Sequence, residues 1–286
     1  MQKNIQKNNE NGKILYGTKA FSGETKVYID DKTGRYKCFL QYEELAKINL
    51  DNSDAATYIK NVARTYCNHG VDGLRIDHAV GPSFAFWKNA IYELGEEFPD
   101  KVFFGEIWGE GIERKNFNTI HFKSLFKKTL YYIFSITQEA WQRDYIGILD
   151  GVLDFEYRRL LLEEIENGNR ILGNRRLEKK VARHFSRYPK DFRLLLFLDN
   201  HDTDRFLFNC HGDISLLEEA IKFSLKWNKA FILYYGTEQN MKNSETIFSG
   251  KPYADLAVRE CMDWSKRTEE TLYVKISKWL RSKYTY

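Results

Sequence analysis

GLRIDHA, residues 73–79, carries an acidic residue, Asp77, directly after a stretch of strand length. Two later runs repeat this pattern, FFGEIWG at 103–109 and FLDNHDT at 197–203. The acidic residues in question are Asp77, Glu106 and Asp202. Acidic side chains at the carboxyl ends of successive parallel strands are typical of a (β/α)8 barrel, because the catalytic residues of that fold lie at the rim formed by these strand ends. The three runs therefore predict one rim that carries three carboxylates.

Strand-like and helical patterns alternate from residue 53 onward. The expected strands are 71–77, 101–107, 151–157, 194–200 and 231–236. A helix is expected to begin at Pro82, and the other expected helices are 54–69, 123–143, 158–167, 174–187, 214–227 and 268–283. Ser53 is expected as the N-cap of the first helix and Gly70 as its end. Apolar strands that alternate with amphipathic helices predict right-handed βαβ units and a parallel sheet.

The expected architecture is α/β, a partial TIM (β/α)8-type barrel of about five parallel βα units rather than eight. These units occupy residues 51–286. Residues 1–50 are polar, with a turn signal at 31–34 and short strand-like pieces, and they predict an irregular or small β segment. An incomplete parallel sheet has open edges that invite pairing. Self-association, or a partner chain that completes the barrel, is therefore expected.

Composition excludes several classes of protein. A hydrophobic share of 43%, a charged share of 29% and a net charge of +4 over 286 residues are typical of an ordinary soluble protein. No run approaches the roughly 20 apolar residues of a membrane span, and the first residues contain no apolar signal segment. The four cysteines contain no CxxC pair and are too few for a disulfide framework. A cytoplasmic protein without a membrane partner is expected.

Basic residues gather in one expected helix, at Arg175, Arg176, Lys179, Lys180 and Arg183. Their spacing is that of a solvated helix face, and no nucleic-acid-binding motif accompanies them. No nucleic-acid partner is expected.

Arg75 and Asp77 lie two positions apart, so in a strand they point to the same face. A charge-assisted pair at the mouth of a barrel would hold Asp77 ionised, as the nucleophile of a glycosidase must be. A purely structural Arg–Asp pair is the alternative.

Glu106 ends an apolar strand and is followed by Ile107 and Trp108. Apolar neighbours raise the pKa of a carboxyl group, which suits a general acid, although a structural Glu remains the alternative.

The run LDNHD at 198–202 is too polar to be buried without partners. His201 is expected to donate to a sugar hydroxyl, and Asp202 to accept from ring hydroxyls as the ring flattens toward an oxocarbenium ion. Asp and His also bind hard cations, but no third ligand of fitting spacing is evident, so no metal site is expected. Trp108 and Tyr234 are the best candidates, with Tyr235, to line a sugar groove.

These runs resemble the conserved regions of the α-amylase family of glycoside hydrolases, family 13. GLRIDHA resembles the strand-4 region, which places Asp77 in the position of the nucleophile and Arg75 in that of its partner. FFGEIWG resembles the strand-5 region, with Glu106 as acid/base. FLDNHDTDR resembles the strand-7 region, with Asp202 as transition-state stabiliser and His201 as a substrate contact. The resemblance implies a retaining glycosidase or transglycosylase that acts on α-glucans or oligosaccharides, with no cofactor required for the chemistry.

The resemblance extends to YYGTEQNM at 234–241, similar to the segment after strand 8, and to residues 45–64. Segments that resemble strands 1 to 3 and the C-terminal β-domain are absent. Val80 and Gly81 stand where many amylases have Lys-His, which removes contacts expected on the leaving-group side. A structural Ca²⁺ finds no support in this sequence. Two alternatives remain: an inactive or partner-dependent fragment with a carbohydrate-binding or subunit role, and a metal-dependent barrel lyase or isomerase.

Overall fold

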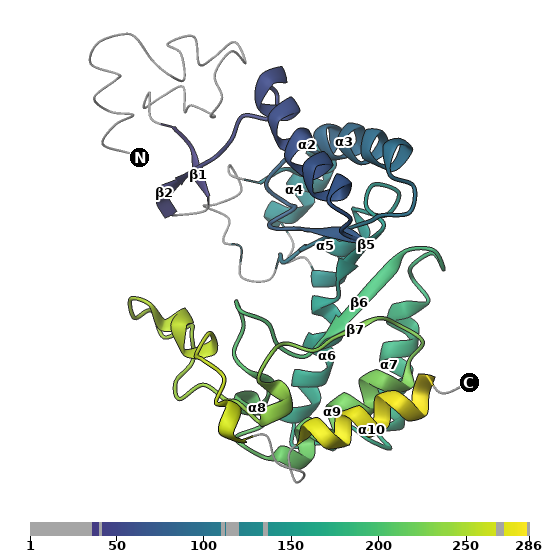
Figure 1. Ribbon diagram of the computed structural model, residues 1–286, viewed down its shortest axis with the longest axis vertical. Helices are drawn as coiled ribbons and strands as arrows, with labels where there is room; N and C mark the ends of the chain where they lie inside the picture. Colours follow the sequence, from purple (N-terminus) through teal and green to yellow (C-terminus); the bar gives the residue numbers. More distant parts are fainter. Residues whose placement is uncertain are drawn as a thin grey trace. The chain divides into compact units, whose positions relative to one another are not determined.

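The computed structural model describes residues 36–39, 42–109, 112, 120–133, 137–266 and 272–284 (Figure 1). The chain forms two compact units, Met1–Asp150 and Gly151–Tyr286. The turn expected at 31–34 lies outside the described residues, and the domain boundary expected at residue 50 stays a prediction. No helix in the described parts of the chain combines the length and apolarity needed to cross a membrane.

The first unit contains a small antiparallel β element followed by two βα units. Its elements are β1 (Cys38–Phe39), β2 (Tyr42–Ala46), α2 (Ser53–Asn68), β3 (Gly73–Ile76), α3 (Phe84–Glu97), β4 (Val102–Gly105), α4 (Leu125–Ile133) and α5 (Gln138–Arg143). Strands β3 and β4 are parallel, with Gly73 opposite Val102 and Ile76 opposite Gly105. This register puts the next residues of the two strands, Asp77 and Glu106, side by side at the carboxyl edge.

Local chemistry fixes the limits of α2. The side chain of Asn52 accepts hydrogen bonds from the backbone N–H groups of Asp54 and Ala55, both at 3.1 Å. Asn52, and not Ser53, is therefore the N-cap, so the sequence prediction was one residue too late. The helix ends before Gly70, whose φ of 89° lies in the left-handed region that glycine adopts at low cost.

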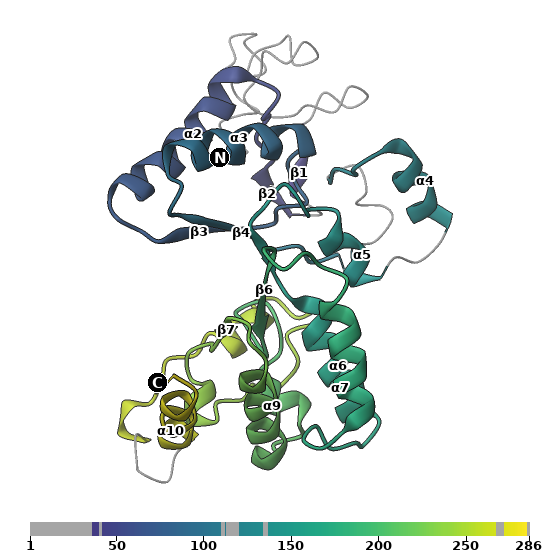
Figure 2. The same cartoon turned by 90° about the vertical axis from the view of Figure 1, so that its right-hand side faces the viewer.

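The second unit carries three parallel strands and their helices. Its elements are β5 (Gly151–Leu153), α6 (Phe155–Glu166), α7 (Arg175–Phe185), β6 (Arg193–Phe197), α8 (Phe206–Asn209), α9 (Ile214–Lys226), β7 (Phe231–Ile232), η3 (Thr237–Gln239), η4 (Ala254–Val258), η5 (Trp264–Lys266) and α10 (Leu272–Tyr284). Val152 lies opposite Leu194, and Leu196 opposite Phe231. Helix α6 packs on α7, and α9 on α10 (Figures 1 and 2).

Several of the predicted elements were too long. The strand expected at 231–236 is only Phe231–Ile232. The strand expected at 151–157 ends at Leu153, because the Asp154 carboxylate accepts the Tyr157 N–H at 3.0 Å and starts helix α6 there. His184 of α7 holds the same carboxylate, with its Nε2 at 3.0 Å from Oδ1 and 2.9 Å from Oδ2. The helix expected at 123–143 is instead two helices, α4 and α5.

Parallel strands are buried on both faces by the helices that connect them. Every residue of β5 is buried, as are four of the five residues of β6. Within each unit the strand order follows the sequence, with β3 beside β4 in the first unit and β5, β6 and β7 in succession in the second. The chain is therefore α/β with five parallel strands, as the alternating pattern predicted.

Helix α7 is anchored by one apolar side and presents a basic side to solvent. Leu177 is fully buried in the main hydrophobic core of the second unit. Replacing Leu177→Ala should lower the free energy of unfolding by about 2–5 kcal/mol, because it removes buried methyl groups and leaves a cavity. Urea unfolding measures this loss. Lys179→Ala, at an exposed position of the same helix, should change stability by less than about 0.5 kcal/mol; equal losses in the two variants would contradict this packing.

Candidate active site

Arg75 joins the two acidic residues at the ends of β3 and β4. Its Nη1 donates to Oδ1 of Asp77 at 2.8 Å, and its Nη2 lies 2.8 Å from Oε1 of Glu106. The second contact is an ion pair without good hydrogen-bond alignment, since Glu106 Oε1 is buried and has no hydrogen bond. One cation thus holds two carboxyl groups that come from neighbouring strands.

The two carboxyl groups lie in different surroundings. Glu106 is 7% exposed, whereas the side chain of Asp77 is 72% exposed. Burial raises the pKa of Glu106 to about 7; the charge of Arg75 lowers it in part, and the nearby Asp77 raises it. A carboxyl group with a pKa near neutrality can donate a proton and later accept one. The exposed Asp77 carboxylate is the one that solvent or a substrate can reach.

His78 follows Asp77 and closes the site from the backbone side. Its N–H donates to Glu106 Oε2 at 3.3 Å, and its φ of 42° is in the left-handed region, which is uncommon outside glycine. The ring stands edge-on to Phe39, with centroids 4.3 Å apart, and burial lowers the pKa of His78 to about 4. Gly81 permits this position, since a Cβ there would lie 2.9 Å from the His78 ring. Sequence reasoning assigned His78 no role, although its place directly after Asp77 was a signal.

Buried side chains fix the loop that follows Asp77. The carbonyl of Ala79 accepts from Trp87 Nε1 at 2.8 Å and from the Tyr145 hydroxyl at 3.1 Å. The carbonyl of Val80 accepts from the backbone N–H of His121 at 2.9 Å, and the Val80 side chain is fully buried. Val80 therefore contributes to packing and not to a surface that a substrate would contact.

Trp108 lies two residues beyond Glu106 and is partly exposed. Gln138 of α5 holds the backbone on both sides of it: Nε2 donates to the Ile107 carbonyl, and Oε1 accepts from the Gly109 N–H. A Cβ at Gly109 would collide with the Trp141 ring, so glycine is required for this close approach. The contact of Trp108 with a sugar stays a prediction.

In the second unit, Asp202 lies between two basic side chains. Its Oδ2 is 2.9 Å from His201 Nε2, and its Oδ1 accepts from Arg259 Nη2 at 2.9 Å. Arg259 Nε also donates to the His201 carbonyl at 3.0 Å, so this one guanidinium holds both residues. The Asn200 side chain accepts from the Asp202 N–H at 2.9 Å. Sequence reasoning missed Arg259, because it lies 57 positions from Asp202 and outside the recognised runs.

Asp199, the other acidic residue of LDNHD, has a structural role. Asp199 is buried, accepts from the Phe206 N–H at 2.9 Å and from the Thr237 hydroxyl at 3.0 Å, and burial raises its pKa. Arg205 is also buried, and its guanidinium lies 4.2 Å from the centre of the Tyr234 ring. The Tyr234 hydroxyl donates to the Val258 carbonyl at 3.3 Å. Tyr234 thus has a cation against its ring, and its contact with substrate stays a prediction.

The structure brings together Arg75, Asp77 and Glu106 in the first unit, and His201 and Asp202 in the second. The convergence of all three acids on one pocket stays a prediction. Within the described ranges, no group of three or more His, Cys, Asp and Glu side chains is placed to hold a metal ion.

Comparison with known proteins gives the family. A model of the α-amylase catalytic domain matches residues 5–286. α-Amylase 2 of Dictyoglomus thermophilum is 30% identical over 231 residues, 80% of this chain and 36% of that protein. Cyclomaltodextrin glucanotransferase of Thermoanaerobacterium thermosulfurigenes is 26% identical over 279 residues, 94% of this chain and 33% of that protein.

Solved structures agree in fold. The three-domain cyclomaltodextrin glucanotransferase CldA superposes with a TM-score of 0.66 at 23% identity, over 95% of this chain and 50% of that one. Cyclic α-maltosyl-(1→6)-maltose hydrolase from Arthrobacter globiformis, in complex with maltose, gives a TM-score of 0.59 at 20% identity, over 88% of this chain and 48% of that one. These neighbours confirm the predicted partial barrel. The chain spans about a third of the length of the curated relatives and half that of the solved ones. It belongs to the α-amylase family.

Proposed function

We propose that this chain carries the nucleophile and the acid/base of a retaining glycosidase or transglycosylase that acts on α-glucans. The observation that carries the proposal is the Arg75 guanidinium between an exposed Asp77 and a buried Glu106. In retaining enzymes the two carboxyl groups lie about 5–5.5 Å apart, and in inverting enzymes roughly 6.5–9.5 Å apart. The contact of both carboxyl groups with one guanidinium supports the shorter, retaining spacing.

The proposed reaction has two steps. Asp77 attacks the anomeric carbon while Glu106 gives its proton to the leaving oxygen, which produces a covalent glycosyl-enzyme. Glu106, now ionised beside Arg75, then takes a proton from water or from a sugar hydroxyl, and that oxygen releases the glycosyl group from Asp77. A pKa of about 7 for Glu106 supports both halves of this cycle. Relatives named as amylase, cyclomaltodextrinase and cyclomaltodextrin glucanotransferase include hydrolases and a transferase, so either acceptor fits.

The second unit supplies the stabilising residues in this proposal. Asp202 would accept from ring hydroxyls in the transition state, and His201 would donate to a hydroxyl beside it. Arg259 holds both, with its Nη2 on the carboxylate and its Nε on the His201 carbonyl. Trp108 and Tyr234 are proposed as sugar contacts.

A second candidate function is a partner-dependent or carbohydrate-binding fragment. Strand β3 favours it, because none of its residues is fully buried, unlike those of β5. A partner chain that completes the barrel belongs to this candidate. The relatives reported above are named as an amylase and a glucanotransferase, which gives no support to a metal-dependent lyase or isomerase.

Replacement of the nucleophile tests the first candidate. Asp77→Asn should lower the rate of hydrolysis of a chromogenic maltooligosaccharide by at least about 1000-fold, because the amide cannot form the glycosyl ester. Asp72→Asn is the matched control and should retain the rate, because Asp72 is an exposed acid that directly precedes the first residue of β3. Activity that survives in Asp77→Asn would contradict the assignment. A wild-type chain without hydrolysis would favour the second candidate.

The pKa of Glu106 is a further prediction. Carbon-13 NMR of labelled glutamate carboxyl groups should show one group that titrates at about pH 7, and this signal should vanish in Glu106→Gln. In Arg75→Gln the midpoint should move upward, because the Arg75 charge lowers the pKa.

The same shift predicts how stability depends on pH. The pKa of Glu106 in the folded chain lies above the ordinary value of 4.5. The protonated Glu106 therefore contributes to the free energy of unfolding in full below about pH 4.5, and this contribution is lost as the pH rises through about 7. Glu106→Gln should lack this decline. A Glu106 midpoint near 4.5 would show that the carboxyl group is not desolvated.

A further inference from the structure

Helix α7 carries a groove on its solvent side, which we call the α7 groove. Its volume of about 470 Å³ lies within the roughly 300–1,000 Å³ of small-molecule sites. Five side chains line it, and all are basic: Arg175, Arg176, Lys179, Lys180 and Arg183. Within the described part of the chain, no acidic side chain lines this groove. The α7 groove is therefore strongly positive.

The opposite side of α7 fixes the helix in place. Leu177 and Val181 are fully buried in the main hydrophobic core of the second unit. In the last turn, His184 is buried and lies 2.9 Å from the Asp154 carboxylate at the start of α6. Side chains three and four positions apart share one face of a helix. The basic side chains are thus held together on the exposed face of a fixed helix.

The acidic side chains that contact α7 already have partners. Glu178, on α7 itself, is paired with Lys226 of α9 at 2.6 Å. Glu163 and Glu164 of α6 are both paired with Lys180, each at 2.9 Å. Of the five basic groups in the groove, Lys180 is therefore the one that α6 neutralises.

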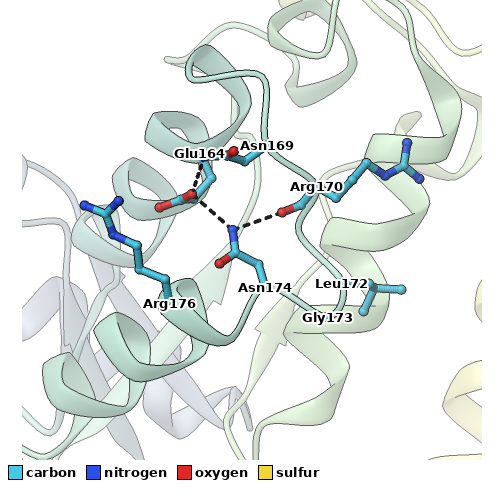
Figure 3. A pocket seen from close by; sticks show the side chains of 7 residues that line it. All are labelled: Glu164, Asn169, Arg170, Leu172, Gly173, Asn174 and Arg176. Carbon is cyan, nitrogen blue, oxygen red and sulfur yellow. Dashed lines mark hydrogen bonds between the residues drawn. The ribbon is translucent and has the colours of Figure 1, made fainter.

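Arg176 shows why the other basic groups stay uncompensated. It also lines a neighbouring pocket of about 360 Å³ that contains Glu164. In Figure 3 the dashed hydrogen bonds of the Glu164 carboxylate run to the amides of Asn169 and Asn174, at 2.9 and 3.1 Å, and none joins it to Arg176. This polar network ties α6 to α7 and leaves Arg176 without a counter-ion.

Four of the five basic side chains have no partner among the described residues. They are Arg175, Arg176, Lys179 and Arg183, and all four are exposed. Single unpaired charges are ordinary on a surface, but here four of one sign surround one groove. Like charges four positions apart on a helix repel each other. A bound anion would relieve this repulsion.

We propose that the α7 groove binds an anion with several linked phosphate groups. The planar guanidinium of arginine donates two parallel hydrogen bonds to a phosphate. A phosphate group carries a charge of about −1.5 to −2 at pH 7, more than a carboxylate, so a short chain of phosphates balances four cations. Arg175 and Arg183 lie about 12 Å apart along the helix axis. A row of linked phosphates therefore meets more of these side chains than a single phosphate does.

Isothermal titration calorimetry of the full chain with sodium tripolyphosphate tests the proposal. Saturable binding is expected, and inorganic phosphate should bind at least about tenfold more weakly because it makes fewer charge-assisted hydrogen bonds. Adenosine triphosphate distinguishes two sources of this chemistry. A nucleotide site should bind it more tightly than tripolyphosphate, and a site for inorganic polyphosphate should not; either result supports the recognition of linked phosphates.

A triple variant identifies the groove. Arg175→Gln/Arg176→Gln/Lys179→Gln should raise the dissociation constant of tripolyphosphate at least about tenfold, because three charged contacts are lost. It should keep the wild-type urea midpoint, since the three side chains are exposed and unpaired in the described structure. If its midpoint falls, Arg183→Gln gives a second measurement, with an expected rise of at least about threefold.

The matched control is Lys190→Gln/Lys242→Gln/Lys278→Gln, which removes three exposed charges elsewhere in the second unit. It should bind tripolyphosphate with the wild-type affinity. Equal weakening in the two triple variants would show attraction to net charge alone and would overturn the proposal. So would an absence of tripolyphosphate binding, equally tight binding of the carboxylate anion citrate, or tighter binding of a single-stranded DNA oligonucleotide.

Discussion

The proposed active site of this chain depends on one guanidinium group held between two carboxyl groups. The parallel register of β3 and β4 places Asp77 beside Glu106, and Arg75 reaches both from within β3. One acid is exposed and the other is buried, so a single cation contacts two groups in different surroundings, and burial raises the pKa of Glu106 alone to about 7. The loop after Asp77 is tied to buried aromatic side chains, which keeps this arrangement in place.

Features set by short-range pattern could be predicted from the sequence. The period-2 spacing placed Arg75 and Asp77 on one face, and the apolar runs located all five parallel strands. Features set by distant partners could not. Strand β5 ends early because Asp154 caps α6 and binds His184, 30 positions away. Arg259 binds Asp202 although the two residues lie 57 positions apart in the sequence, and no local sequence pattern predicts such a contact.

The polar run LDNHD illustrates both cases. Its polarity after an apolar strand indicated a functional rim, and sequence reasoning assigned a sugar contact to Asp202 but no role to Asp199. In the structure Asp199 turns inward to the Phe206 N–H and the Thr237 hydroxyl, while Asp202 stays partly exposed with His201 and Arg259. The difference comes from burial, which only the three-dimensional packing determines.

Covalent labelling tests most directly whether Asp77 forms a bond to the sugar. The chain would be treated with an activated fluorinated α-glucosyl substrate, whose glycosyl-enzyme hydrolyses slowly, and then digested for peptide mass spectrometry. We expect one added glycosyl group on the peptide that contains Asp77, and none in the Asp77→Asn variant. A glycosyl group on a different residue, or turnover of substrate without any adduct, would contradict it.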